Sequence, residues 1–256
     1  MNTKMHEMDA ALEKIKEYGA VKPAFKEEVL EAVLLLDLLR DVLGYDAEDS
    51  ERQRPYTERQ RPHEGSEGRE IPDIILLKLA APPGEESKNV FVEIKRYGAF
   101  RSKSKHLAAL RQAAKYSITK RHDYGIVTDG VRWTYFVITD STRPSRRKVK
   151  AKVARRVAEF DMEDARQIPL GKMILARSCG SELLALFGVL ARVHKTMAAA
   201  DLDAIKELTS IDKRIEAAWG EGKPSAKERK LLYLLYHKNN LSLNSEYFCE
   251  EILPLK

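Results

Sequence analysis

Two short apolar runs decide the fold of this chain: IPDIILL at residues 71–77 and VFVEIK at residues 90–95. Each predicts a β-strand, and each carries charged residues, Asp73 in the first run and Glu93 and Lys95 in the second. Side chains alternate along a strand, so Glu93 and Lys95 share one face and the apolar residues between them point to the other. The segment between the runs has turn composition, which allows the strands to pair as neighbours. Two carboxylates and one amine are therefore expected to converge at the end of a sheet, as a divalent-metal site with a lysine beside it.

The order Pro72-Asp73, then Glu93-x-Lys95, resembles the motif of the PD-(D/E)xK nuclease superfamily. Within it, the chain is similar to the N-terminal nuclease domain of type I restriction enzyme R subunits and to their stand-alone relatives. The resemblance implies an α/β, restriction-endonuclease-like core, with a central mixed β-sheet flanked by helices. It also implies that Asp73, Glu93 and the backbone carbonyl of Ile94 hold Mg²⁺ or Mn²⁺, while Lys95 orients the nucleophile or neutralises charge on the phosphate.

Upstream, residues 24–46 have the apolar period of a helix, which is expected to end near Gly44. Glu28 lies on the flank of the apolar stripe of that helix. The resemblance assigns to Glu28 the helix glutamate that joins the metal site directly or through water; a solvated helix glutamate is the alternative. The expected stripe consists of Phe25, Val29, Ala32, Leu36, Leu39 and Leu43.

Downstream, residues 102–121 predict a second helix, with Leu107, Leu110, Ala114 and Ile118 as its buried stripe. Gln112 and Tyr116 are four residues apart on the opposite side, where such a pair can project together into a groove. Their spacing resembles the Q-x-x-x-Y motif of many nucleases of the superfamily, which makes them candidate site residues. A surface glutamine and a half-packed tyrosine are the alternative.

The segment YGIVTDGVRWTYFVI at residues 124–138 predicts a β-hairpin that turns at Asp129-Gly130. The order helix, strand, strand, helix, strand, strand fits an α/β core with a mixed sheet. Residues 153–162 are expected to add one more strand. We expect a nuclease-like domain over residues 1–162, with a polar, flexible loop at about 47–70 that contains ERQRP twice.

Residues 163–256 predict a C-terminal helical region. Such helices form a small bundle that packs either on the core or on a second copy of the chain as a homodimer, and the sequence leaves both open. The string GEGKPS has no preceding apolar strand and has Pro224 where a phosphate loop needs Ser or Thr. No ATP requirement is therefore expected.

Basic residues are segregated along the chain. Nine Lys or Arg and no acidic residue lie between Ile94 and His122, and eight more lie between Arg143 and Ala158. Each run alone is typical of a solvated surface, but next to a candidate phosphodiesterase site the pattern indicates a polyanion-binding face. The expected nucleic-acid contacts are Arg96, Arg101, Lys103, Lys105, Arg111, Lys115, Arg146, Arg147 and Lys148.

The composition of 256 residues, 43% of them hydrophobic, fits one domain with a smaller appendage. Two cysteines without a CxxC motif suit a reducing compartment. The sequence indicates no signal peptide and no stretch that is apolar enough to span a bilayer, so we expect a cytoplasmic protein without membrane contact.

The functional expectation is metal-dependent hydrolysis of DNA phosphodiester bonds by a stand-alone nuclease of the restriction or defence type, and the sequence leaves cleavage at ends or at internal sites open. Two alternatives stay open. The same fold could serve as a non-catalytic DNA-binding or assembly module in a defence or repair system. A nuclease that cleaves RNA is the other.

Overall fold

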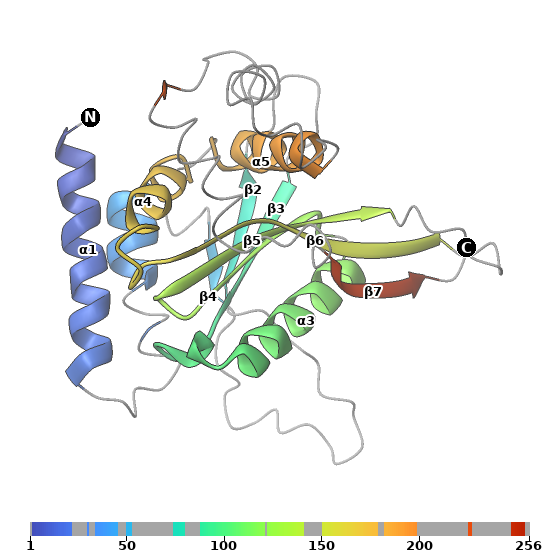
Figure 1. Cartoon of the computed structure of the whole chain (residues 1–256), viewed down its shortest axis with the longest axis horizontal. Helices are drawn as coiled ribbons and strands as arrows, with labels where there is room; N and C mark the ends of the chain where they lie inside the picture. The colour runs from blue at the N-terminus through green and yellow to red at the C-terminus, as the bar shows by residue number, and fades with distance from the viewer. Residues whose placement is uncertain are drawn as a thin grey trace.

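The computed structural model describes residues 2–21, 30, 34–45, 50–52, 74–79, 88–120, 122–140, 150–178, 182–198, 225–226 and 247–253. Within these residues, seven strands form one sheet in chain order, β1 to β7 (Figure 1). The strands are β1 (Ser50–Arg52), β2 (Ile74–Leu79), β3 (Lys88–Ile94), β4 (Tyr124–Thr128), β5 (Arg132–Asp140), β6 (Lys150–Asp161) and β7 (Tyr247–Leu253). The helices are α1 (Asn2–Val21), η1 (Leu34–Val42), η3 (Ala99–Arg101), α3 (Lys103–Lys120), α4 (Ile168–Ala176) and α5 (Glu182–Ala198).

The sheet is mixed, which confirms the α/β class. β2 and β3 pair as neighbours, as the turn composition between them allows, and they run antiparallel. β3 and β4 run parallel, and α3 makes the crossover that a parallel pair requires. The remaining neighbours, including β4 with β5 and β5 with β6, are antiparallel.

The hairpin between β4 and β5 turns where the sequence predicts. Gly130 has a φ of 82°, a left-handed value that favours glycine. The Asp129 carboxylate accepts hydrogen bonds from the backbone N–H groups of Val131 at 3.0 Å and of Arg132 at 2.7 Å. An aspartate that closes its own turn in this way is the reason that Asp-Gly marks a hairpin.

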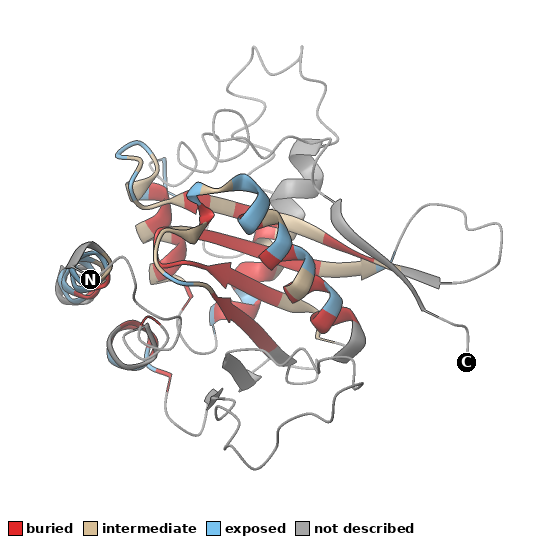
Figure 2. Cartoon of the chain, turned by 90° about the horizontal axis from the view of Figure 1, so that it is seen from below, coloured by how far each residue is buried: buried red, intermediate tan, exposed pale blue. Residues whose placement is uncertain are grey.

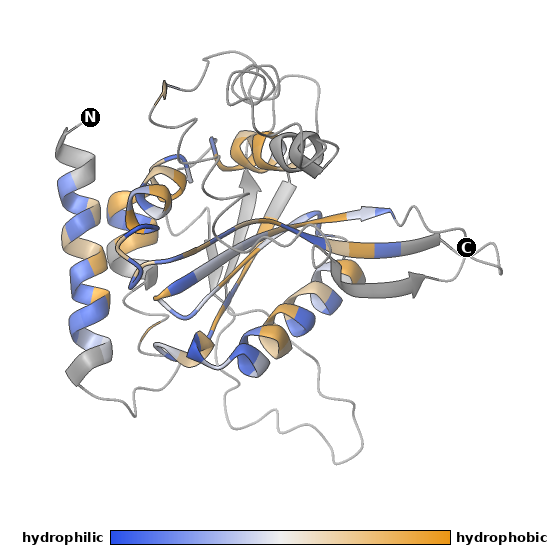
Figure 3. Cartoon of the chain, viewed as in Figure 1, coloured by the Kyte–Doolittle hydropathy of each residue, from blue (hydrophilic) through white to orange (hydrophobic). Residues whose placement is uncertain are grey.

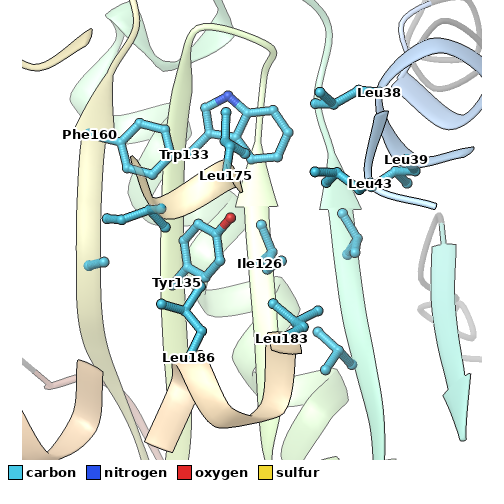
Figure 4. Packing of buried hydrophobic residues seen from close by; sticks show 14 of the residues in the cluster. Leu38, Leu39, Leu43, Ile126, Trp133, Tyr135, Phe160, Leu175, Leu183 and Leu186 are labelled. Atoms are coloured by element: carbon cyan, nitrogen blue, oxygen red, sulfur yellow. The ribbon is translucent and has the colours of Figure 1, made fainter. Parts of the chain in front are cut away.

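Strand alternation divides the interior into two hydrophobic cores. Val90, Val92 and Ile94 belong to the larger core, which α1, η1, α4 and α5 cover. Figure 4 shows part of this core, with Leu39 of η1, Leu175 of α4 and Leu183 of α5 beside the sheet. Phe91 points to the smaller core, which α3 covers from the other side of the sheet (Figure 1). The central strands are therefore buried on both faces, and Figure 2 shows them in red beneath the helix that lies in front.

The helix predicted to end near Gly44 ends there, but its last turns are wider than expected. η1 is a π-helix, in which the Leu43 N–H donates to the Leu38 carbonyl at 2.9 Å. Leu39 and Leu43 of the predicted stripe are buried, and the wider turns also bury Leu38 and Val42. The other predicted members of the stripe lie outside the residues whose side chains are described.

The polar segment 47–70 is not loop throughout, because it contains β1, which pairs with β2 at the edge of the sheet. Residues 53–73 lie outside the described residues. The strand expected at residues 153–162 is present as part of the longer β6.

The C-terminal region joins the same sheet and the same core. α4 and α5 contribute Leu175 and Phe187, both fully buried, to the larger core. Ser178, at the end of α4, hydrogen-bonds through its hydroxyl with the Tyr135 hydroxyl at 2.9 Å, and its carbonyl accepts from the Tyr45 hydroxyl at 2.8 Å. β7, in a segment expected to be helical, pairs with β6. The described part of this region thus packs on the core, one of the two arrangements left open above.

Candidate functional site

Glu93 and Lys95 form an ion pair at the end of β3. Both side chains point to the α3 side of the sheet, because the alternating Val92 and Ile94 belong to the larger core. The Lys95 Nζ lies 2.7 Å from the Glu93 Oε1, and the side chains of the two residues are 21% and 2% exposed, respectively. A carboxylate buried to this degree needs a compensating charge, and Lys95 supplies it.

The backbone around this pair is fixed by strands on both sides. Glu93 is the partner of Val127 in β4, and the Lys95 N–H donates to the Thr128 carbonyl at 2.8 Å. On the other side, Val92 is the partner of Ile74, the first residue of β2. The acidic side chain therefore stands between two paired strands, where its position is well defined.

Glu28 and Asp73 lie outside the described residues, and Asp73 is the residue that precedes Ile74 in the chain. Within the described residues, no group of three or more His, Cys, Asp or Glu side chains is close enough to hold a metal ion. Of the predicted metal ligands, the described part of the chain contains Glu93 and the backbone of Ile94.

The two candidate residues of α3 have different environments. Tyr116 is only 8% exposed, and its ring stacks on that of Phe91 with the centroids 5.1 Å apart. It packs on the sheet, so the predicted projection into a groove does not describe this tyrosine. Gln112 is half-buried one helical turn earlier, toward the end of β3 that carries Glu93, because α3 starts beyond that end and returns along the sheet.

A polar cluster under α3 was missed by the sequence analysis. The His106 Nε2 lies 2.9 Å from the Thr134 Oγ1, and the Glu159 Oε2 is 3.0 Å from the Arg156 Nη1 and 3.5 Å from Thr134. Burial lowers the pKa of His106 to about 4, so the ring is neutral at physiological pH. No local pattern distinguishes this histidine, because its partners come from other strands.

Strand register brings this cluster and the ion pair into one row. Glu93 is the partner of Val127, Val127 of Thr134, and Thr134 of Glu159. Directly opposite residues in neighbouring strands share a face. The α3 side of the sheet therefore carries charged or polar side chains in β3, β5 and β6 at the same level.

Asp129 ties the loop after Lys95 to the hairpin. Its carboxylate accepts from the Phe100 N–H at 2.6 Å, and its carbonyl from the Gly98 N–H at 3.3 Å. Burial raises the pKa of Asp129, although its backbone hydrogen bonds act in the opposite direction. Its role in the structure is to hold the chain that leaves β3.

The predicted basic contacts of this region lie at the surface. Figure 3 shows alternating hydrophilic and hydrophobic patches along α3, with the hydrophilic ones turned away from the sheet. Arg101 is paired with Glu163, with 2.5 Å between its Nη2 and the Oε1. Arg146, Arg147 and Lys148 lie outside the described residues. The exposed predicted contacts are Arg96, Arg101, Lys103, Lys105, Arg111 and Lys115.

Comparison of the chain with models of known protein families, with curated proteins and with solved structures finds no match. None of the helices in the described residues is both long enough and apolar enough to cross a bilayer. The arrangement of the side chains is thus the basis for assigning a function.

Proposed function

We propose that the protein is a stand-alone nuclease of the PD-(D/E)xK type that hydrolyses DNA phosphodiester bonds with Mg²⁺ or Mn²⁺ and without ATP. The observation that carries the proposal is the buried Glu93 carboxylate paired with Lys95 at the end of a central strand. Because a buried ion pair contributes little net stability, stability alone does not account for it. Buried charges of this kind are typical of functional sites. We further propose that the sheet is a restriction-endonuclease-like core and that the protein acts in the cytoplasm.

The donor set suits a hard cation. Glu93 and the Ile94 carbonyl offer oxygen ligands, and Asp73 and Glu28 would complete the set. Asp73 directly precedes Ile74, the first residue of the strand that pairs with the strand of Glu93. When bound, the cation would supply Lewis-acid polarisation of the phosphate.

The protein's own groups would do the rest. The Lys95 ammonium, two residues from Glu93 on the same face, can orient the attacking water or stabilise negative charge that develops on the phosphate. Gln112 can donate to a phosphate oxygen from the α3 side. The exposed basic residues would bind the flanking backbone and give affinity without sequence specificity.

Cleavage of supercoiled, linear and single-stranded DNA in Mg²⁺, Mn²⁺ or EDTA tests the proposal. Wild type is expected to cut in either metal, and Asp73→Ala and Glu93→Gln are expected to lose at least about a hundredfold in rate. Glu159→Gln is the matched control, because Glu159 is also a paired carboxylate on the α3 side of the sheet. Intact DNA over a wide salt range with wild type would refute a nuclease function.

The same ion pair favours one second candidate, a DNA-binding module without catalysis. Lys95 already neutralises Glu93 without a metal ion, so the carboxylate can be structural. DNA binding that depends steeply on salt, is unchanged by Mg²⁺ and is equal in wild type and Glu93→Gln would support that function.

A further inference from the structure

A cleft of about 350 Å³ lies directly beyond the candidate catalytic strand. It is lined by the loop after Lys95, by the first turn of α3 and by Gly19 of α1. Its lining residues, all within the described part of the chain, include three cations, Arg96, Arg101 and Lys105, and no acidic residue. A concave surface with this charge attracts an anion.

The wall of the cleft is pre-organised. The loop that forms it is bonded at Gly98 and at Phe100 to Asp129, a fully buried residue. Gly98 has a φ of 66°, which lets the chain turn sharply between Lys95 and α3. A rigid wall reduces the entropy cost of holding a ligand.

The three cations differ in what they can offer. Glu163 engages the Nη2 and Nε of Arg101, which fixes the guanidinium and offsets part of its charge. Arg96 and Lys105 are exposed and lie at the two ends of the loop. The described residues that line the cleft with them include no carboxylate. They are therefore the cations expected to contact an anion directly.

Neutral donors complement these charges. Ser102 lines the cleft just before α3, an 18-residue helix without acidic residues in its first turn, so the positive end of the helix dipole faces the same region. The Tyr97 side chain also lines the cleft, and a tyrosine hydroxyl is protonated at neutral pH and can donate a hydrogen bond. Hydroxyl donors, backbone N–H groups and cations together are the usual set for phosphate oxygens.

We propose that this cleft holds one phosphate group of a nucleic-acid strand, next to the phosphate placed at Glu93 and Lys95. Arg96 follows Lys95 in the chain, so the lining of the cleft begins one residue beyond the candidate catalytic lysine. The inference rests on the proposed function for the identity of the strand. It distinguishes Arg96 and Lys105 from the other exposed basic residues.

Binding of fluorescent oligonucleotides to the full chain in EDTA tests the cleft without cleavage. Arg96→Ala and Lys105→Ala are each expected to weaken binding about five- to tenfold and to reduce the salt slope by about one. Lys16→Ala is the control, since Lys16 is an exposed cation of α1 that does not line the cleft. It is expected to change the affinity less than about twofold.

Two further measurements show whether the cleft binds phosphate and which phosphate of the strand it binds. Inorganic phosphate, compared with chloride at equal ionic strength, should displace the oligonucleotide from wild type and not from Arg96→Ala/Lys105→Ala. Oligonucleotides with and without a 5′-phosphate separate the sources. If the variants weaken binding of both oligonucleotides equally, the cleft holds an internal phosphate. If they weaken binding of the 5′-phosphorylated oligonucleotide alone, the cleft holds the terminal phosphate.

The proposal is overturned if the double variant binds as wild type does, or if Lys16→Ala weakens binding as much as Lys105→Ala. Since this assay needs neither metal nor cleavage, it can refute phosphate binding in the cleft while metal-dependent cleavage persists. Conversely, the cleft can hold a phosphate in a protein that cuts nothing.

Discussion

The Glu93 carboxylate is buried, and the protein compensates for its charge with Lys95. A carboxylate that is 2% exposed is tolerated because Lys95 reaches it from the same strand. Removing one partner of such a pair costs more than the pair contributes, because the other charge remains buried.

Lys95→Ala should therefore destabilise the protein by about 3 kcal/mol, and Glu93→Gln/Lys95→Ala should recover part of that loss. Denaturant unfolding in EDTA measures both. Lys152→Ala is the control, since its partner Asp140 is 72% exposed and the pair is worth about 0.5 kcal/mol. Equal losses for Lys95→Ala and Lys152→Ala would show that Glu93 does not need its cation.

His106 gives the protein a pH-dependent stability. The pKa of His106 is lowered to about 4 by burial, whereas an unfolded histidine titrates near 6.5. Above pH 6.5 both states are neutral and the contribution is fully present. As the pH falls toward 4 only the unfolded state binds the proton, so stability is lost.

Relative to His106→Gln, wild type should lose about 3 kcal/mol of unfolding free energy between pH 7 and pH 4. Chemical denaturation at several pH values measures the difference between the two proteins, which removes the contribution of other groups. A pH-independent gap for His106→Gln would contradict the buried, neutral ring.

Among the secondary-structure elements, two glycines with similar positive φ values allow backbone strain to be compared with side-chain crowding. Gly44 ends η1 with a φ of 73°, and a Cβ there would meet nothing within 4 Å. Gly130 has a φ of 82° in the hairpin, and a Cβ there would lie 3.0 Å from Ile15, 3.2 Å from Leu30 and 3.2 Å from Tyr97. The hairpin thus approaches α1 as closely as glycine allows.

Gly44→Ala should cost about 1 kcal/mol, which is the price of a left-handed alanine. Gly130→Ala should cost about 1–3 kcal/mol more, because α1 and the loop after β3 must shift. Thermal and denaturant unfolding compare the two variants. If the two variants are equally stable, the close approach of the hairpin to α1 does not add to the cost of the Gly130→Ala substitution.

Across the whole molecule, helices that precede and follow the central strands in the chain stabilise the sheet. α1 supplies Met8 and Ile15 to the larger core, and α5 supplies Phe187 and Leu190. Tyr135, in the middle of the sheet, has ring contacts with Phe187 of α5. Burial of such aromatic and aliphatic side chains is the main stabilising contribution in a domain of this size.

A chain truncated after residue 162 should therefore lack a cooperative unfolding transition and should bind a hydrophobic dye. Near-ultraviolet circular dichroism and denaturant titration measure this. Phe187→Ala in the full chain is the milder companion and should cost about 3–5 kcal/mol. A truncated chain with native-like dichroism would show that residues 1–162 form an independent domain.

By itself, the sequence determined the elements whose signals are local. Short apolar runs with turn residues between them indicated that β2 and β3 are neighbours, and Asp129-Gly130 predicted the hairpin. The apolar period predicted α3 and the end of the helix at Gly44. These signals depend on neighbours in the chain, so no tertiary information is needed to detect them.

Which side chains share an environment depends on how distant segments of the chain pack together. Tyr116 was expected beside a groove but packs on Phe91, and His106 was unremarkable in sequence but contacts Thr134. The C-terminal segment was expected to be helical, yet β7 completes the edge of the sheet beside β6. Contacts of this kind join residues far apart in the chain, and their energy comes from packing and charge compensation, which no local pattern records.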